Sequence, residues 1–421
     1  MTHTTDDLIW ERWISLALMG GVVSSLLSIA VSDILFGISI LLWLVHCWKR
    51  RKLSLKAPPF IAFLWAFLAA VLIAIVFSSD VLISALYLKK FIKFFYVFLI
   101  FTYLNRERVE YALKAMVMVL GISAGYGILQ YFWLLDINLV NRIDGFMGHW
   151  MTFSGQLMLV SVALGGYLLF YQLPQTLAGG QDGTSQEAEK GERMGWLSRE
   201  VLSLGAGSVL LALLLFVLVL THTRSAWLGT MGGLLLLLSV YRVRWLLAAI
   251  LILIALFFAL PSGLKERFYS SFDLTDTTTR GRMELLLTAK NMIVAHPWTG
   301  LGPNMVSRRY QDYNETDEFE TWLYQHLHNN FLQIAAEMGV ITLLIWVALW
   351  VRLFWDFARF FRDPASDRFL SCLAMSGIGV LVAFLLAGLF EYNFGDSEIL
   401  ILLLFFITIP YVVHGGQEKG A

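Results

Sequence analysis

The stretch that decides the fold of this chain runs from Pro261 to Asn330. It begins with Pro-Ser-Gly-Leu-Lys-Glu-Arg and ends with Tyr-Gln-His-Leu-His-Asn-Asn, and it is the longest polar interval between strongly apolar runs. Basic residues dominate its first two thirds, an acidic run follows over 312–320, and two histidines precede the next apolar run. A simple connection between two helices needs only a handful of residues. We therefore expect the chemistry of the protein to lie in or beside this interval.

The composition of the whole chain is that of a membrane protein. Of the 421 residues, 58% are hydrophobic and 15% are charged, and the mean hydropathy is +0.69. Soluble domains are about 45–50% apolar and about 25% charged. The formal net charge is zero, so the overall charge balance gives no indication of a nucleic-acid partner, and we expect none.

Apolar runs long enough to cross a bilayer recur along the chain. A membrane-spanning helix needs about 20 mostly apolar residues. Such runs lie near 13–30, 33–48, 60–77, 89–104, 111–133, 151–173, 201–220, 225–241, 244–260, 329–355, 369–391 and 397–414. The first begins directly after Glu11 and Arg12 without a basic leader, so we interpret it as an uncleaved span.

The fold class predicted from these runs is an all-α integral membrane protein with about 12 transmembrane helices and one large, partly helical loop. The expected organisation is nine helices in 1–260, the loop in 261–328, and three helices in 329–421. The connection over 174–200 contains several glycines and mixed charges, and we assign it no role.

The basic residues in the short connections predict the orientation, because positively charged loops stay in the cytoplasm. They form four groups in alternate connections: Lys49, Arg50, Arg51, Lys52 and Lys56; Arg106 and Arg108; Arg242 and Arg244; Arg359, Arg362 and Arg368. Both termini are then cytoplasmic, and the long loop lies on the outer side. Cys47 and Cys372 fall near cytoplasmic helix ends, where a structural disulfide is not expected.

One arginine on the outer side lies unusually close to the membrane. Arg224 stands in Leu-Thr-His-Thr-Arg-Ser-Ala-Trp-Leu, between two apolar runs and in a connection too short for its guanidinium to move far. An ionisable residue at such a depth points to a function. We interpret Arg224 as an anion-binding residue, with a structural ion pair as the alternative.

A second cationic site is predicted inside the long loop. Thr277-Thr-Thr-Arg-Gly-Arg-Met-Glu precedes a helical pattern that Pro297 ends, so a helix should begin near Thr278. The free N–H groups of its first turn, together with the side chains of Arg280 and Arg282, would bind phosphate or diphosphate. The alternative is a capped surface helix with solvated arginines.

The two histidines at the end of the loop are the candidate proton acceptors. His326 and His328 share a face only if the segment is extended, so their spacing alone does not favour a metal clamp, and we predict no metal. A single neutral imidazole can accept a proton from a hydroxyl. An interfacial anchoring role is the alternative. The acidic run 312–320 lacks a recognisable ligand spacing, so a solvated face is favoured over a cation site.

Two motifs resemble those of the bacterial O-antigen ligases. Arg224-Ser-Ala-Trp-Leu228 matches R-x-x-x-L, and His328-Asn329 is followed after nine residues by Gly339-Val-Ile-Thr342, which matches the His-Asn and Gly-x-x-Thr pair. Two further segments resemble the wider ligase and polymerase superfamily: Gly281-Arg282 through Pro303, and Arg142 through His149.

The resemblance implies a membrane glycosyltransferase similar to the C-type glycosyltransferases, without a cofactor. Such ligases move O-antigen glycan from undecaprenyl diphosphate to a hydroxyl of lipid A–core on the periplasmic face of the bacterial inner membrane, in lipopolysaccharide biosynthesis. By motif, His328 is implied as the catalytic residue, and Arg224 and Arg282 as diphosphate-binding residues. Arg280 is a third predicted diphosphate-binding residue, by its proximity to Arg282, and His326 and Arg142 are possible additional site residues. The expected partners are this lipid-linked donor, the lipid A–core acceptor and membrane lipids.

Three other functions remain open at this point. An O-antigen polymerase and a protein oligosaccharyltransferase of the same superfamily would share most of these features. A transporter of polyprenol-linked sugars is a rival of another class, and it predicts polar residues in the middles of the spans and not at one face.

Overall fold

The computed structural model of the chain is helical throughout the part that it describes. That part comprises residues 5–53, 55–134, 142–178, 189–259, 277–315 and 325–417, with Lys265 and Tyr269. Its first helices are α1 (Thr5–Ser24), α2 (Ile29–Arg50), α3 (Ile61–Val76), α4 (Val81–Leu86), η1 (Tyr87–Phe94), α5 (Phe95–Tyr103), α6 (Arg106–Leu129), η2 (Gln130–Leu134), α7 (Trp150–Tyr167), η3 (Leu168–Gln172) and α8 (Leu173–Ala178). They are followed by α9 (Glu189–Leu220), α10 (Arg224–Tyr241), α11 (Val243–Ala259), α13 (Thr277–Ala295), α14 (Val306–Tyr313), α15 (Asn330–Arg362), α16 (Arg368–Ala387), η5 (Asn393–Gly395) and α17 (Ser397–Gln417). None of these residues lies in a strand, which confirms the predicted all-α class.

Seven helices of the described part are long and apolar enough to cross a membrane. They cover Ile29–Arg50, Arg106–Trp133, Trp150–Gln172, Ser203–Leu220, Asn330–Arg362, Arg368–Ala387 and Ser397–Gln417. Two shorter apolar helices, Ile61–Val76 and Val243–Ile252, stand beside them. The chain is a multi-pass membrane protein, and the number of twelve spans remains a prediction.

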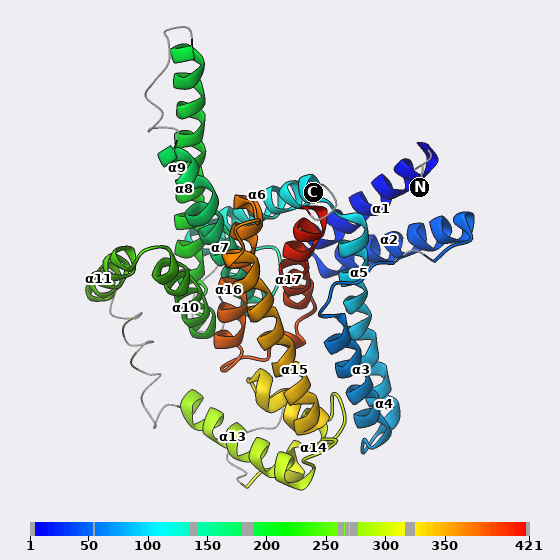
Figure 1. The fold of residues 1–421 in the computed structure, drawn as a ribbon. Helices are drawn as coiled ribbons and strands as arrows, with labels where there is room; N and C mark the ends of the chain where they lie inside the picture. Colours follow the sequence, from blue (N-terminus) through cyan, green and yellow to red (C-terminus); the bar gives the residue numbers. More distant parts are fainter. Residues whose placement is uncertain are drawn as a thin grey trace.

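Helices α7, α16 and α17 form the centre of the bundle. Every residue of α7 from Thr152 to Gly166 is buried, and so is every residue of α17 from Ile399 to Val413. A helix that is apolar all round is expected in the core of a large protein. Helix α16 packs between them and α10 (Figure 1). Large apolar side chains of α2, α3 and α11 such as Leu41, Leu72 and Leu251 point outward, as expected for a surface that faces lipid.

The predicted helix inside the long loop is present. Helix α13 begins at Thr277, one residue before the expected start, and ends at Ala295, two residues before Pro297. Figure 1 shows α13 and α14 on one side of the molecule, opposite the two chain ends. The rest of the predicted loop 261–328 is described only in part, because 260–264, 266–268, 270–276 and 316–324 lie outside the described residues.

The predicted span over 329–355 differs from the observed helix, because α15 is broken at Gly339. The backbone of Gly339 has a φ of 86°, and a Cβ there would lie 2.0 Å from the Trp298 carbonyl oxygen. A turn that follows α13 fills the break: the N–H groups of Leu301 and Gly302 donate to the carbonyls of residues 336 and 337, at 2.9 Å each. The Val340 N–H donates to the Pro297 carbonyl at 2.8 Å. The interrupted backbone is therefore hydrogen-bonded by the loop, as a helix break inside a membrane requires.

Candidate active site

The candidate site lies where α15 begins and the turn between α16 and α17 folds over it. Asn329 caps α15: its Oδ1 accepts hydrogen bonds from the N–H groups of Phe331 and Leu332 at 2.8 and 3.0 Å, and its Nδ2 donates to the Leu389 carbonyl. The Asn330 N–H donates to the Gly388 carbonyl at 2.7 Å. These bonds hold the two histidines of the loop against the 388–396 turn.

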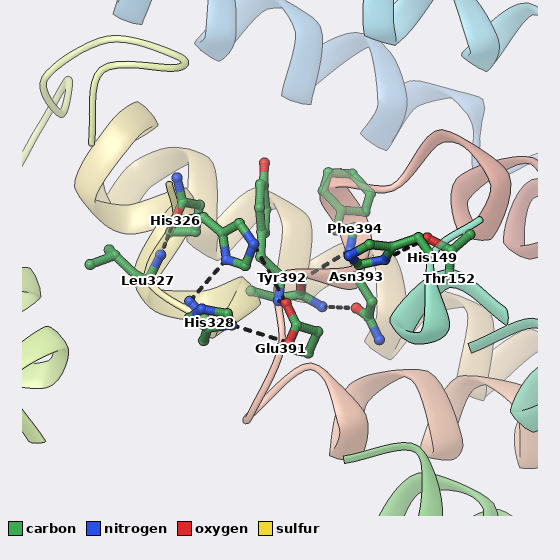
Figure 2. A network of polar contacts seen from close by, with 11 residues as sticks. His149, Thr152, His326, Leu327, His328, Glu391, Tyr392, Asn393 and Phe394 are labelled. Atoms are coloured by element: carbon green, nitrogen blue, oxygen red, sulfur yellow. Dashed lines mark hydrogen bonds and ion pairs between the residues drawn. The ribbon is translucent and has the colours of Figure 1, made fainter. Parts of the chain in front are cut away.

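Both histidines face one carboxylate. His328 Nδ1 lies 3.1 Å from Glu391 Oε2, and His326 Nε2 lies 3.7 Å from Glu391 Oε1 (Figure 2). The two imidazole rings are 4.2 Å apart between centroids. This geometry arises because the segment is neither extended nor helical: His328 has a φ of 47°, in the left-handed region. The expectation that the two side chains share a face only in an extended segment therefore does not apply.

The charge states follow from burial and neighbours. Burial, followed by repulsion from His328, lowers the pKa of His326 to about 4, so this imidazole is neutral at pH 7. Burial by itself would raise the pKa of Glu391. The hydrogen bond from His328 and the electrostatic attraction of its ring outweigh the effect of burial, so the pKa of Glu391 falls below its usual value. Glu391 is then an ionised acceptor, and the Nδ1 atom of His328 must be the donor to it.

The donor atoms present would also suit a metal ion, but their hydrogen bonds argue against it. The ligand atoms of His326, His328 and Glu391 all lie within 4.8 Å of one another. However, the His328 N–H donates to His326 Nδ1 at 3.3 Å, so the proton of the neutral His326 ring is on Nε2, the atom that faces Glu391. A metal would need a lone pair on that nitrogen. The three residues therefore fit a hydrogen-bonded group better than a metal centre.

Two tyrosine side chains, Tyr392 and Tyr87, connect this group to Lys90. The ring of Tyr392 lies 5.9 Å from that of His326, and its hydroxyl lies 2.8 Å from the Tyr87 hydroxyl. Lys90 Nζ donates to the Tyr87 hydroxyl at 3.3 Å. Lys93, three residues further on, pairs instead with Asp33. Of Lys90 and Lys93, only Lys90 reaches the site through these contacts.

Arg142 lies beside the first turn of α7. Its guanidinium stands over the ring of Trp150 at 5.3 Å, and the imidazole of His149 stacks on the same ring at 5.0 Å. Figure 2 shows His149 beside the 391–394 turn. The Arg142–His149 motif thus places the His149 imidazole within electrostatic range of His326, and Arg142 on the neighbouring Trp150 ring.

Arg224 lies at the same end of the bundle as His328. It is the first residue of α10, and Gly229, five residues further on, packs so closely on α16 that a Cβ would lie 2.6 Å from the Ala383 carbonyl oxygen. Gly233 contacts Gly379 in the same way, so α10 and α16 run antiparallel. Five residues of helix span about 7.5 Å. Arg224 is therefore level with the turn that begins after α16 and contains Glu391, and its side chain is half-buried.

Arg280 and Arg282 are both in the first turns of α13. Arg280 is exposed and Arg282 is half-buried. One turn further on, Leu285 belongs to a buried apolar cluster that also contains Leu327, the residue between the two histidines. This cluster fixes α13 against the start of α15, on the side of the molecule where the histidines lie.

Sequence reasoning did not assign the carboxylate at the centre of the group. Glu391 was visible only as one of several acids after an apolar run, with no motif to single it out. The roles of the Gly-x-x-Thr residues also emerge only in the structure: Gly339 permits the break in α15, and the Thr342 hydroxyl donates to the Met338 carbonyl beside it at 2.7 Å. The His-Asn element supplies the imidazole and the helix cap.

Residues 209–347 match the protein-family model described as O-antigen ligase. The match supports the O-antigen ligase superfamily for this chain. It covers Arg224, Arg280, Arg282, His326 and His328, whereas Arg142 and Glu391 lie outside it. No curated protein matches the chain. The family indicates a glycosyltransferase-like membrane enzyme of the O-antigen ligase and polymerase superfamily, with lipid-linked glycans and membrane lipids as the class of substrates and partners.

Proposed function

We propose that this protein is an O-antigen ligase, which transfers O-antigen glycan from undecaprenyl diphosphate to a hydroxyl of lipid A–core in lipopolysaccharide biosynthesis. The reaction would take place at the periplasmic face of the bacterial inner membrane, with both termini in the cytoplasm. The observation that carries the proposal is the contact of 3.1 Å between His328, which precedes α15 and belongs to the His-Asn and Gly-x-x-Thr motif, and Glu391 in the turn after α16.

His328 would act as the general base. Glu391 accepts a hydrogen bond from Nδ1–H, so in the unprotonated ring the lone pair lies on Nε2. That atom would accept the proton of the acceptor hydroxyl as its oxygen attacks the anomeric carbon. His326, neutral and in contact with the other oxygen of Glu391, would hold the carboxylate in place.

Fixed cations would stabilise the leaving group. As the bond between the sugar and the diphosphate breaks, negative charge grows on the diphosphate, and guanidinium groups aimed at it lower the barrier. Arg224 and Arg282 are the leading candidates, and Arg280 and Arg142 are further ones. Since the donor already carries a good leaving group, the proposed reaction is metal-independent and uses no other cofactor.

The stereochemistry follows from a single displacement. The hydroxyl oxygen forms a bond to the anomeric carbon as the carbon–oxygen bond to the diphosphate breaks on the opposite face, so the configuration inverts. The proton moves to His328, and the undecaprenyl diphosphate leaves with the electron pair. The mechanism needs no covalent intermediate with the enzyme.

The test is incubation of the purified protein with undecaprenyl-diphosphate-linked glycan and lipid A–core, followed by analysis of the products. A ligated lipopolysaccharide is the expected product. A longer glycan on the lipid carrier would instead identify a polymerase, and glycan on an added acceptor protein would identify an oligosaccharyltransferase. Movement of intact donor across the membrane without any product would identify a transporter.

A further inference from the structure

A basic cavity lies at the opposite end of the bundle from the histidines. It has a volume of about 660 Å³ and opens between the last turns of α15 and α17. Its polar and charged lining residues are Arg352, Asp356, Arg359, Arg362, Asp363, Tyr411 and His414. None of these residues takes part in the proposed glycosyl transfer.

The three arginines of the cavity share one face of α15. Arg359 lies seven residues after Arg352, and Arg362 lies ten residues after Arg352. This spacing keeps the three side chains on one side of the helix over about 15 Å. Arg359 and Arg362 are exposed, whereas Arg352 is half-buried. The face therefore presents guanidinium groups from the depth of the cavity to its outer edge.

The inner part of the cavity is fixed by a buried carboxylate. Asp356 accepts hydrogen bonds from Arg352 Nε at 2.8 Å and from the Tyr411 hydroxyl at 2.6 Å, and its side chain is 7% exposed. The three arginines outnumber the two carboxylates, Asp356 and Asp363, so the lining keeps a net positive charge. The charge that is not balanced lies toward the outer arginines.

The walls of the cavity are apolar and include a tryptophan that points outward. Trp355 is 65% exposed, and it lies on the arginine face, between Arg352 and Arg359. Pro59 and Phe101 line the same cavity. A large aromatic ring beside exposed arginines is typical of the depth at which lipid headgroups lie. A ligand that fits must carry an anionic group for the arginines and apolar chains for Trp355.

We propose that this cavity binds the headgroup phosphate of an anionic phospholipid of the surrounding leaflet, with the acyl chains against Trp355. The position is the one expected for such a lipid. Figure 1 shows the two chain ends at this end of the bundle, and the ion pair of Arg106 with Asp367 and the antiparallel packing of α10 on α16 place Arg106 and Arg242 there as well. Basic pockets between helices on the cytoplasmic side bind anionic headgroups in this way.

The experiment measures which lipids stay bound to the full-length protein purified in mild detergent. The protein is mixed with phosphatidylglycerol or phosphatidylcholine, and the complexes are counted by native mass spectrometry. We expect phosphatidylglycerol to bind preferentially, and the double variant Arg359→Ala/Arg362→Ala to lose roughly thirtyfold in affinity for it, the factor expected for two arginines. The matched control Arg242→Ala/Arg244→Ala removes two exposed arginines of another connection and should bind as the native protein does.

Three results would overturn the proposal. Equal binding of the two lipids would show that charge does not select the ligand. Undiminished binding of phosphatidylglycerol by the double variant would place the lipid elsewhere. The third result concerns the unfolding temperature. If inorganic phosphate alone raises it as much as phosphatidylglycerol does, the ligand is a free anion. A charge-preserving variant, Arg359→Lys/Arg362→Lys, should keep most of the binding if the double alanine variant folds poorly.

Discussion

The two ends of the helix bundle carry their charges in different ways. At the end that contains the candidate site, Glu391 is 8% exposed, and two imidazoles and a backbone N–H point at its oxygens. At the other end most of the arginines are exposed, and the ion pair between Arg106 and Asp367 is partly exposed; the pair of Arg352 with the buried Asp356 is the exception. Exposed ion pairs contribute little to stability. We therefore relate the basic residues at that end to the predicted orientation and the proposed lipid contact, and the buried group to the proposed chemistry.

The largest effect is expected from His328→Ala. If His328 is the general base, the variant should lose about 10²–10⁴-fold in turnover, because that is the usual contribution of a positioned base. Binding of the lipid-linked donor should remain. The measurement is the rate of ligation together with donor affinity. The matched control is His296→Ala, which removes an exposed imidazole that contacts Tyr313 and should leave the rate unchanged. Equal rates in the two variants would remove His328 from the mechanism.

A smaller loss is expected from Glu391→Gln. A hydrogen bond to a charged group is worth roughly 1.5–3 kcal/mol, so the turnover should fall about 10- to 100-fold. Without the carboxylate, the Nδ1–H of His328 loses its ionised acceptor, so we expect the loss in kcat and not in the affinity for the lipid-linked donor. The control is Glu398→Gln, which changes a half-buried acid of the first turn of α17. A weaker donor affinity with an unchanged kcat would mean that Glu391 does not position His328 for the reaction.

The break in α15 gives a prediction about stability. Gly339→Ala forces a side chain into a backbone conformation with a φ of 86° and against the Trp298 carbonyl, so we expect a loss of at least about 1–3 kcal/mol. Gly125→Ala is the matched control, because a Cβ at this helical glycine meets open space and the substitution should be neutral or stabilising. Thermal unfolding of both variants checks this. Equal unfolding temperatures would show that the break does not require glycine.

The smallest effect is a pH dependence of stability at the buried end. The pKa of His326 falls from 6.5 to about 4 on folding, so the unfolded chain binds more protons between these values and stability should decrease as the pH falls through this window. Asp396 acts in the opposite sense: burial raises its pKa to about 7, so its contribution is lost as the pH rises toward that value. The difference in unfolding temperature between the native protein and His326→Gln isolates the histidine. A difference that does not change between pH 4 and 6.5 would contradict the assignment.

Much of the fold could be predicted from the sequence, because apolar runs and loop charges obey rules that act locally. The all-α class, the helix that begins at Thr277 and its end before Pro297 required no knowledge of distant contacts. The break at Gly339 could not be predicted, because its free backbone groups are hydrogen-bonded by residues 297–302. Those residues lie far earlier in the chain, and no local pattern links them to Gly339.

The site was predictable where a motif carried it and not elsewhere. His328 and Arg224 stand in short patterns, whereas Glu391 is more than sixty residues from His328 along the chain and meets it only through the turn after α16. The contact between His326 and His328 depends on the left-handed backbone of His328, which no spacing rule anticipates for a non-glycine residue. Residues that act through long-range contacts need the structure.

The central claim is that His328 and Glu391 act as one unit, and a double-mutant cycle tests it most directly. The measurement is kcat/KM for ligation by the native protein, His328→Ala, Glu391→Gln and the double variant. We predict that the double variant is no slower than His328→Ala, because the carboxylate has no catalytic role once the imidazole is gone. Losses that multiply in the double variant would show that the two residues act independently, and that result would contradict the account.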